Sequence, residues 1–179
     1  MGKIVNLGLT LAIFCVISAG MLAYVFMMTG PRIEANAHAS FEGSLREVLP
    51  GADAFKPAPA APEARSEIYE GTAGGHLVGY AVKTAPRGYS GEIVMLVGVD
   101  PEFRVQGMKI LSQRETPGLG TNVAKPKFQK QFIGKGVQDA LEPKKDIDAI
   151  TGATISSRAV CEGVKTVLKD ARQYREVKP

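Results

Sequence analysis

Four side chains with hydroxyl groups lie within seven residues near the carboxyl end of the sequence, in the segment Thr151-Gly-Ala-Thr-Ile-Ser-Ser157. The hydroxyl residues are Thr151, Thr154, Ser156 and Ser157, and the small residues between the first two are Gly152 and Ala153. A helix N-cap needs only one Ser or Thr. The free N–H groups of a helix start also favour a phosphate group. The segment therefore indicates either an N-cap or a place that holds phosphate.

A second candidate segment is the loop Glu115-Thr-Pro-Gly-Leu-Gly120. Its members are Glu115, Thr116, Pro117, Gly118, Leu119 and Gly120. The proline and the two glycines give a tight, sterically open backbone that a flat ligand can approach closely. The leucine offers an apolar contact to such a ligand. The glutamate and the threonine offer polar atoms either to the edge of the ligand or to brace the loop, and an ordinary turn would have the same composition.

Other kinds of chemistry have little support in the sequence. The only two histidines are His38 and His76, and neither has Cys or paired carboxylates at ligand spacing, so we expect no metal site. Cys161 has no His partner nearby and is more typical of a packing residue than of a nucleophile. The net charge is +4, but no stretch combines dense Lys and Arg with aromatic residues, so we expect no nucleic-acid partner.

The amino-terminal region has the composition of a membrane anchor. No charged residue lies between Ile4 and Pro31. A helix over residues 4–28 would be roughly 37 Å long, enough to cross a hydrocarbon core of ~30 Å. A cleaved signal peptide is the alternative, but its apolar region usually runs only about 7–15 residues. The weak charge balance between Lys3 and Arg32 favours an amino terminus in the cytoplasm, with the rest of the chain exported.

The remaining sequence predicts an α+β fold: an antiparallel sheet flanked by helices, with one amino-terminal transmembrane helix. Alternating or strongly apolar patterns predict strands over 76–84, 92–100 and 104–112, and short turns between them favour an antiparallel meander. Helices are predicted over 33–49, 128–132 and 156–174, and a short apolar strand is predicted just before Gly152. The Pro- and Ala-rich stretch 56–63 is typical of an extended linker. The expected domains are an anchor over 1–31, a juxtamembrane helix and linker over 32–66, and a soluble domain over 67–179.

Both candidate segments resemble motifs of one known family, the FMN-binding domains. Thr151-Gly-Ala-Thr154 resembles the tetrad that is flavinylated in that family, with Thr at its first position where Ser is commoner. The Glu115–Gly120 loop resembles the second signature of the family, and Gly88-Tyr-Ser-Gly91 resembles its strand turn. The resemblance covers about residues 68–175.

The resemblance implies a covalent cofactor. In FMN-binding domains of this kind a transferase attaches FMN through a phosphoester to the last Thr of the tetrad, which corresponds to Thr154. The Glu115–Gly120 loop would then lie against the isoalloxazine, and Arg158 is close enough in sequence to contact the phosphate. From the residues alone, Thr151, Ser156 and Ser157 are rival acceptors, and one of the two serines is expected to cap the helix.

The size and layout of the chain are similar to those of the G subunits of Rnf complexes, the ion-translocating ferredoxin:NAD⁺ oxidoreductases. The C subunits of sodium-translocating NADH:quinone reductases have the same plan but are typically longer. This resemblance implies an electron carrier without an active site of its own, with the other complex subunits and a flavin transferase as partners. It also implies the bacterial cytoplasmic membrane, with the soluble domain on the periplasmic side. A non-redox, membrane-anchored binding or structural module is the alternative of a different class.

Overall fold

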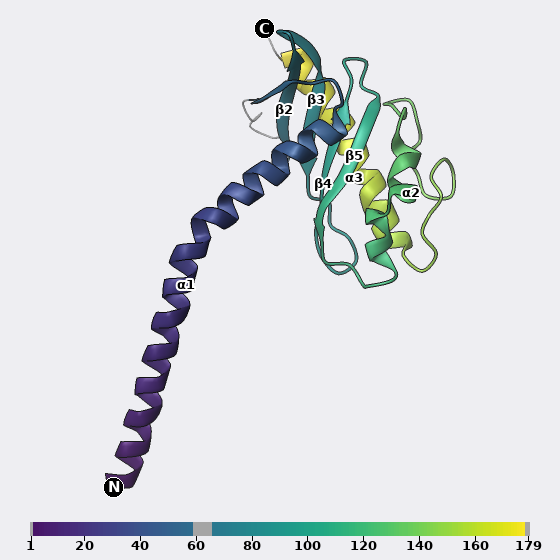
Figure 1. The fold of residues 1–179 in the computed structure, drawn as a ribbon. Helices are drawn as coiled ribbons and strands as arrows, with labels where there is room; N and C mark the ends of the chain where they lie inside the picture. Colours follow the sequence, from purple (N-terminus) through teal and green to yellow (C-terminus); the bar gives the residue numbers. More distant parts are fainter. Residues whose placement is uncertain (1, 59–65, 178–179) are drawn as a thin grey trace. The chain divides into compact units, whose positions relative to one another are not determined.

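The computed structural model of the chain describes residues 2–58 and 66–177. The chain divides into two compact units, residues 1–42 and 43–179. Figure 1 shows the elements in chain order.

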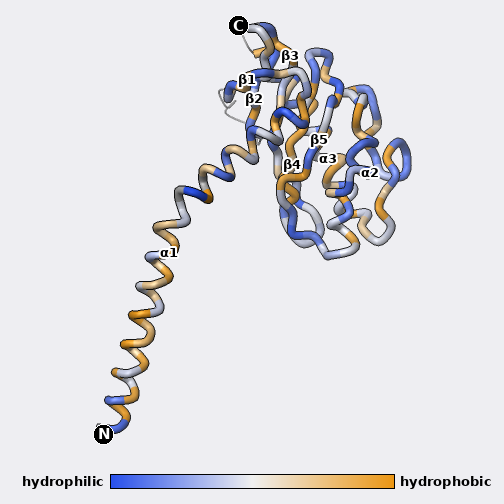
Figure 2. The backbone as a smooth tube through the Cα atoms, viewed as in Figure 1, coloured by the Kyte–Doolittle hydropathy of each residue, from blue (hydrophilic) through white to orange (hydrophobic). Residues whose placement is uncertain are grey.

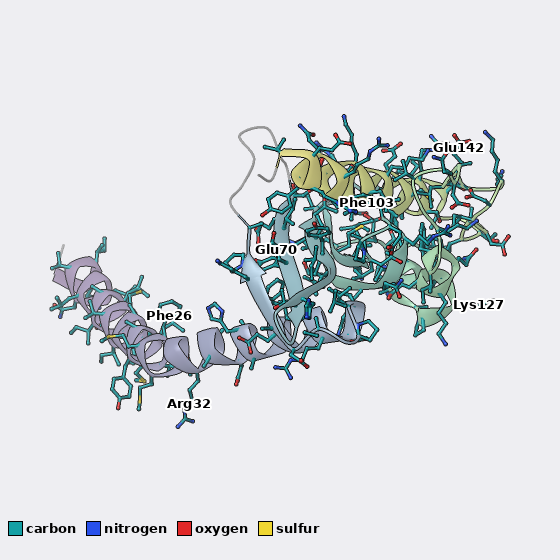
Figure 3. All side chains as sticks on the ribbon, turned by 90° about the horizontal axis from the view of Figure 1, so that it is seen from above. Phe26, Arg32, Glu70, Phe103, Lys127 and Glu142 are labelled. Carbon is teal, nitrogen blue, oxygen red and sulfur yellow. The ribbon has the colours of Figure 1, made fainter. Side chains whose placement is uncertain are left out.

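Helix α1 (Gly2–Val48) carries the predicted anchor. It is one helix of 47 residues, so the helix predicted over 33–49 is the continuation of the anchor helix and not a separate element. The large apolar side chains between Ile4 and Met28 are exposed, and Figure 2 shows hydrophobic colours along most of this stretch. Figure 3 shows Phe26 and Arg32 pointing away from the helix. The helix is long and apolar enough to cross a membrane.

The sheet has five strands in the order β1-β2-β3-β4-β5, with every neighbouring pair antiparallel. The strands are β1 (Ala54–Pro57), β2 (Glu67–Ala73), β3 (His76–Thr84), β4 (Ile93–Val99) and β5 (Val105–Gln113). The predicted meander is confirmed, and β3 has the bounds that alternation predicts. The first two residues of the linker expected over 56–63 belong to β1, and most of the rest, 59–63, lies outside the described residues.

One face of the sheet packs against helix α3 (Thr154–Val177), as Figure 1 shows. Alternation turns Met95 and Val97 of β4 to this face, where they share a core with Val160 and Val164 of α3. The elements η1 (Gly120–Ala124), α2 (Pro126–Gln129) and η2 (Lys130–Phe132) contribute Val123, Phe128 and Phe132 to the same core. The predicted helices over 128–132 and 156–174 are therefore present with shifted ends.

The other face of the sheet is covered by the end of α1. Leu45, Val48 and Leu49 are buried there. Val48 and Leu49 lie over glycines of four adjacent strands: Gly71, Gly79, Gly98 and Gly107. A Cβ on Gly71 would stand 2.4 Å from Leu49 Cδ2, so the missing side chains are what let the helix end approach the sheet.

The strand predicted before Gly152 is absent from the described structure. Residues 148–150 are irregular. The N–H of Asp148 donates to Oε1 of Gln131 at 2.7 Å, and the N–H of Ile150 donates to Oγ of Ser157 at 3.1 Å. The prediction was wrong because side chains, and not a neighbouring strand, take up these backbone groups.

Candidate functional site

The two candidate segments lie on opposite sides of one cleft of about 610 Å³. Three parts of the chain line it: the turn after β3, the loop after β5 and the start of α3. The lining residues are Tyr89, Glu115, Thr116, Leu119, Gly120, Gly152, Ala153, Thr154, Ile155 and Ser156. Four of the predicted site residues, Pro117, Gly118, Thr151 and Ser157, are not among them.

The loop Glu115–Gly120 is held by its own hydrogen bonds. The N–H groups of Leu119 and Thr121 donate to the carbonyl of Thr116, at 3.2 and 3.3 Å. The N–H of Gly118 donates to Oγ1 of Thr121 at 3.0 Å, and Nδ2 of Asn122 donates to the carbonyl of Gly118 at 2.8 Å. Gly118 has φ of 78°, a left-handed conformation that favours glycine. Sequence reasoning missed Thr121 and Asn122, whose bonding role depends on the turn geometry.

Glu115 braces the loop. The sequence leaves two roles open for this residue, a polar contact to a ligand or bracing of the loop, and its hydrogen bonds in the structure are those of a brace. The residue is only 5% exposed. Its Oε1 accepts from the N–H of Ser90 at 3.0 Å, and its Oε2 accepts from Oγ of Ser156 at 2.5 Å. Burial raises the pKa of this carboxyl, but the hydrogen bonds from Ser156 and from the N–H groups of Ser90, Tyr89 and Gly91 outweigh burial and hold the pKa below its ordinary value.

The two serines do not cap α3, so that expectation was wrong. The helix begins at Thr154, which puts Ser156 and Ser157 inside its first turn, where both are buried. Ser156 donates to Glu115, and Oγ of Ser157 donates to the carbonyl of Ala153 at 3.0 Å while accepting from Ile150. Their hydroxyls connect α3 to the neighbouring loops.

The two threonines differ from the serines and from each other. Thr151 is exposed and lines neither of the clefts beside α3. Thr154 is half-buried, and within the described residues its hydroxyl has no hydrogen-bond partner. It lines the first cleft and also a second one of about 320 Å³. Among the four hydroxyl residues of the segment, Thr154 therefore combines two properties. It lines both clefts, and its hydroxyl has no hydrogen-bond partner among the described residues.

The second cleft is bordered by charged side chains. Its lining residues are Leu141, Glu142, Pro143, Lys144, Thr154, Arg158, Cys161, Glu162 and Lys165. Nζ of Lys165 lies 3.8 Å from Glu142, which Figure 3 labels beside α3. Lys144 and Arg158 are exposed, and neither forms an ion pair in the part of the chain that the structure describes. The cleft therefore offers two unpaired positive charges to an anion.

Apolar side chains and an open backbone line much of the first cleft. Three of its lining side chains, those of Tyr89, Leu119 and Ile155, are exposed at 70, 44 and 53%. A flat ring bound in the cleft would cover their apolar surface. A Cβ on Gly152 would lie 3.0 Å from Leu119 Cδ2, so a side chain there would crowd the cleft between the start of α3 and the Glu115–Gly120 loop.

Two further features bear on metal binding and on thiol chemistry. Within residues 2–58 and 66–177, no group of three or more His, Cys, Asp or Glu side chains is arranged to hold a metal ion. Burial raises the pKa of the Cys161 thiol to about 12, so this thiol is protonated at neutral pH.

Comparison with known proteins identifies the family. Residues 88–169, which include every residue of the first cleft, match the FMN-binding domain family, and residues 1–48 match the RnfG N-terminal region. The G subunit of the Na(+)-translocating ferredoxin:NAD(+) oxidoreductase complex from Acetobacterium woodii is 35% identical, over 89% of this chain and 87% of that protein. The chain belongs to the RnfG family.

A second relative supports this assignment, and one solved structure shares the fold. The G subunit of the proton-translocating ferredoxin:NAD(+) oxidoreductase complex from Clostridium ljungdahlii is 34% identical, over 92% of this chain and 89% of that protein. The crystal structure of the C subunit of the Na(+)-translocating NADH-quinone reductase from Parabacteroides distasonis aligns with a TM-score of 0.50 and 22% identity, over 64% of each chain. This likeness is one of fold, and it confirms the predicted α+β class. The alternative, a C subunit of a sodium-translocating NADH:quinone reductase, is supported by this likeness of fold alone.

Proposed function

We propose that this RnfG protein is the membrane-anchored flavin subunit of an ion-translocating ferredoxin:NAD⁺ oxidoreductase complex and carries electrons on FMN held in the first cleft. The observation that carries the proposal is the cleft itself, in which the Glu115–Gly120 loop faces the start of α3 inside the FMN-binding region. When bound, FMN accepts and donates one or two electrons. The chain's own residues bind and orient it. The partners are the other subunits of the complex.

We further propose that the FMN is attached covalently, as a phosphoester on Thr154. The hydroxyls of Ser156 and Ser157 are buried and already bonded to Glu115 and Ala153. Thr151 is exposed and outside both clefts. Thr154 has an uncommitted hydroxyl between an apolar cleft, which suits the ring, and a cleft with Lys144 and Arg158, which suits the negative phosphodiester.

The experiment for this assignment uses the Thr154→Ala variant and the matched control Thr151→Ala, each co-expressed with a flavin transferase. The denatured proteins are run on a gel and viewed under ultraviolet light. We expect the fluorescent band in the wild type and in Thr151→Ala and its loss in Thr154→Ala. A band that persists in Thr154→Ala would contradict the assignment of the acceptor. A wild-type chain that purifies without flavin would favour the non-redox module.

The soluble domain is proposed to lie outside the cytoplasm, at the periplasmic face of the inner membrane. The uncharged stretch before Arg32 and the basic Lys3 before it support this orientation. Protease added to intact spheroplasts is expected to digest the chain after residue 66. Full protection in intact spheroplasts, with digestion only after lysis, would reverse the orientation.

A further inference from the structure

Glu115 is a buried carboxylate at the meeting point of all three walls of the first cleft. Its oxygens accept hydrogen bonds from the turn after β3, through Ser90, and from α3, through Ser156. Its own N–H donates to Oε1 of Gln113 at 2.6 Å, which fixes the residue at the end of β5. One side chain therefore connects segments that lie 25 and 41 residues apart from it in the sequence.

Two glycines leave the space that this carboxylate occupies. A Cβ on Gly88 would stand 2.4 Å from Oε1 of Glu115. A Cβ on Gly120 would stand 2.7 Å from Oε2 and 2.8 Å from Oγ of Ser156. Any larger residue at either position would displace the carboxylate, so the turn and the loop are shaped around Glu115.

The charge on Glu115 is stabilised by neutral donors. Among the described residues, no Lys or Arg forms an ion pair with it. Hydrogen bonds to the charged form favour ionisation, and hydrogen bonds from neutral donors leave the net charge of the group in place. A negative charge in a partly buried site is screened less than one on the surface.

We propose that Glu115 is the positioning residue of the cleft, holding its three walls in one arrangement and setting a fixed negative charge beside the flavin. The proposal rests on the proposed function for the assignment of flavin to this cleft. A fixed negative charge opposes the arrival of electrons on a neighbouring group, so Glu115 lowers the midpoint potential of FMN bound there.

Two substitutions separate the bracing from the charge. Glu115→Gln keeps the size of the side chain and an oxygen that accepts from Ser90, while Ser156 turns to accept from the new amide, so the walls stay joined and the charge is lost. Glu115→Ala removes both the bonds and the charge. Glu102→Gln is the matched control, because Glu102 is an exposed carboxylate in the β4–β5 turn and lines neither cleft.

Two measurements on the full-length chain decide the proposal. In redox titrations of the flavinylated protein, we expect Glu115→Gln to raise the FMN midpoint potential above those of the wild type and Glu102→Gln. In hydrogen exchange of the protein produced without transferase, we expect amides of the 88–91 turn and the 116–120 loop to exchange about tenfold faster in Glu115→Ala, and at the wild-type rate in Glu102→Gln.

Each negative result has a defined meaning. An unchanged midpoint potential in Glu115→Gln, or unchanged exchange in Glu115→Ala, overturns the proposal. If Glu115→Ala does not fold, Ser156→Ala replaces it, and normal exchange in the 116–120 loop of that variant overturns the bracing. If even the wild type takes up no FMN, the proposed function fails, and the exchange measurement still decides whether Glu115 positions the walls.

Discussion

The carbonyl oxygen of Val48 lies so close over Gly98 that a Cβ on the glycine would stand 2.0 Å from it. The end of α1 and strand β4 are therefore in contact backbone to backbone. Gly107 on β5 is paired with Gly98 in the sheet, and its Cβ would stand 2.8 Å from the same oxygen. The close approach seats Leu45, Val48 and Leu49 on the sheet, where they are buried.

A methyl group at position 98 should therefore disrupt this contact. Since the atom it meets is backbone and cannot rotate away, we expect Gly98→Ala to lower the free energy of unfolding by about 1–3 kcal/mol. The matched control is Gly43→Ala, where a Cβ in α1 meets nothing within 4 Å and better helix propensity should leave stability equal or higher. Thermal unfolding measures both. Equal melting temperatures for Gly98→Ala and the wild type would contradict the contact.

The same contact predicts where the chain can be shortened. A chain that begins at Gly43 keeps the three buried side chains, and we expect it to fold without the anchor. A chain that begins at Gly51 loses them, at about 1.5–3 kcal/mol each, and uncovers the glycine-lined face of the sheet. Because the stability of a domain is typically about 5–15 kcal/mol, we expect this shorter chain to aggregate or unfold. Circular dichroism and gel filtration compare the two, and a folded monomer from Gly51 onward would refute the prediction.

The sequence predicts the central strands well because their signals are local. Alternation within β3 and a continuous apolar run in β4 predict strands without any information from the rest of the chain. The roles of Gly71, Gly79, Gly98 and Gly107 are not local. The atoms nearest to a side chain at Gly71, Gly98 and Gly107 belong to Val48 and Leu49, and those nearest at Gly79 belong to Val99 of β4 and to Leu49. A single glycine in a strand pattern indicates a bulge or a close approach, but it does not say which segment approaches.

The candidate site likewise has features that the sequence predicts and features that depend on long-range contacts. Motif resemblance brings the Glu115–Gly120 loop and the Thr151–Ser157 segment together on one cleft, as the structure has them. The functions of individual hydroxyls were less predictable. Capping rules assign Ser156 or Ser157 to the start of the helix, whereas the structure bonds Ser156 to a carboxylate 41 residues away in the sequence. A side chain with a long-range partner carries no signal of it in its own neighbourhood.

The conformation of the loop at Gly118 should be sensitive to substitution by residues that rarely adopt a left-handed backbone. Its Cβ would meet nothing within 4 Å, so its φ of 78° is the sole constraint. We expect Gly118→Val to shift the loop and so perturb the absorption spectrum or the midpoint potential of bound FMN, with a folding cost of roughly 1–2 kcal/mol. Gly118→Asn is the matched control, because Asn tolerates this conformation. Identical flavin spectra and potentials in the Val variant and the wild type would make the loop an ordinary turn.

Arg158 should help to hold the phosphate if Thr154 carries it. The two residues are four apart on α3 and line the same cleft, where Arg158 has no ion-pair partner among the described residues. We expect Arg158→Glu to lower the fraction of chain that becomes flavinylated, because it places a negative charge beside a negative phosphodiester. Lys169→Glu makes the same charge change further along α3, away from this cleft, and should leave flavinylation unchanged. Equal loss in both variants, measured by flavin fluorescence on a denaturing gel, would point to net charge instead of a local contact.

The wall of the second cleft depends on Asp146. One carboxylate oxygen accepts from the N–H of Leu141 at 2.9 Å, and the other accepts from the N–H of Glu142 at 2.8 Å. Nζ of Lys135 lies 3.4 Å from Oδ2. Burial raises the pKa of Asp146, but the two N–H donors and the Lys135 ammonium outweigh burial and hold the pKa below its ordinary value of 3.8. The ionised carboxylate is therefore the form that the fold stabilises.

This shift gives a stability difference with a predictable dependence on pH. A group whose pKa is lowered on folding stabilises the fold above its unfolded-state pKa, and the contribution disappears as the pH falls through the folded-state value. We expect Asp146→Asn to lower the free energy of unfolding by about 1–2 kcal/mol between pH 5 and 7, and the difference from the wild type to narrow below about pH 4. Asp53→Asn, at an exposed carboxylate with no bonded partner in the described part of the chain, is the control and should match the wild type throughout. Denaturant unfolding from pH 7 down to about pH 3 measures the series. A difference for Asp146→Asn that stays constant down to the lowest pH would mean that the lost interaction does not depend on the charge of Asp146.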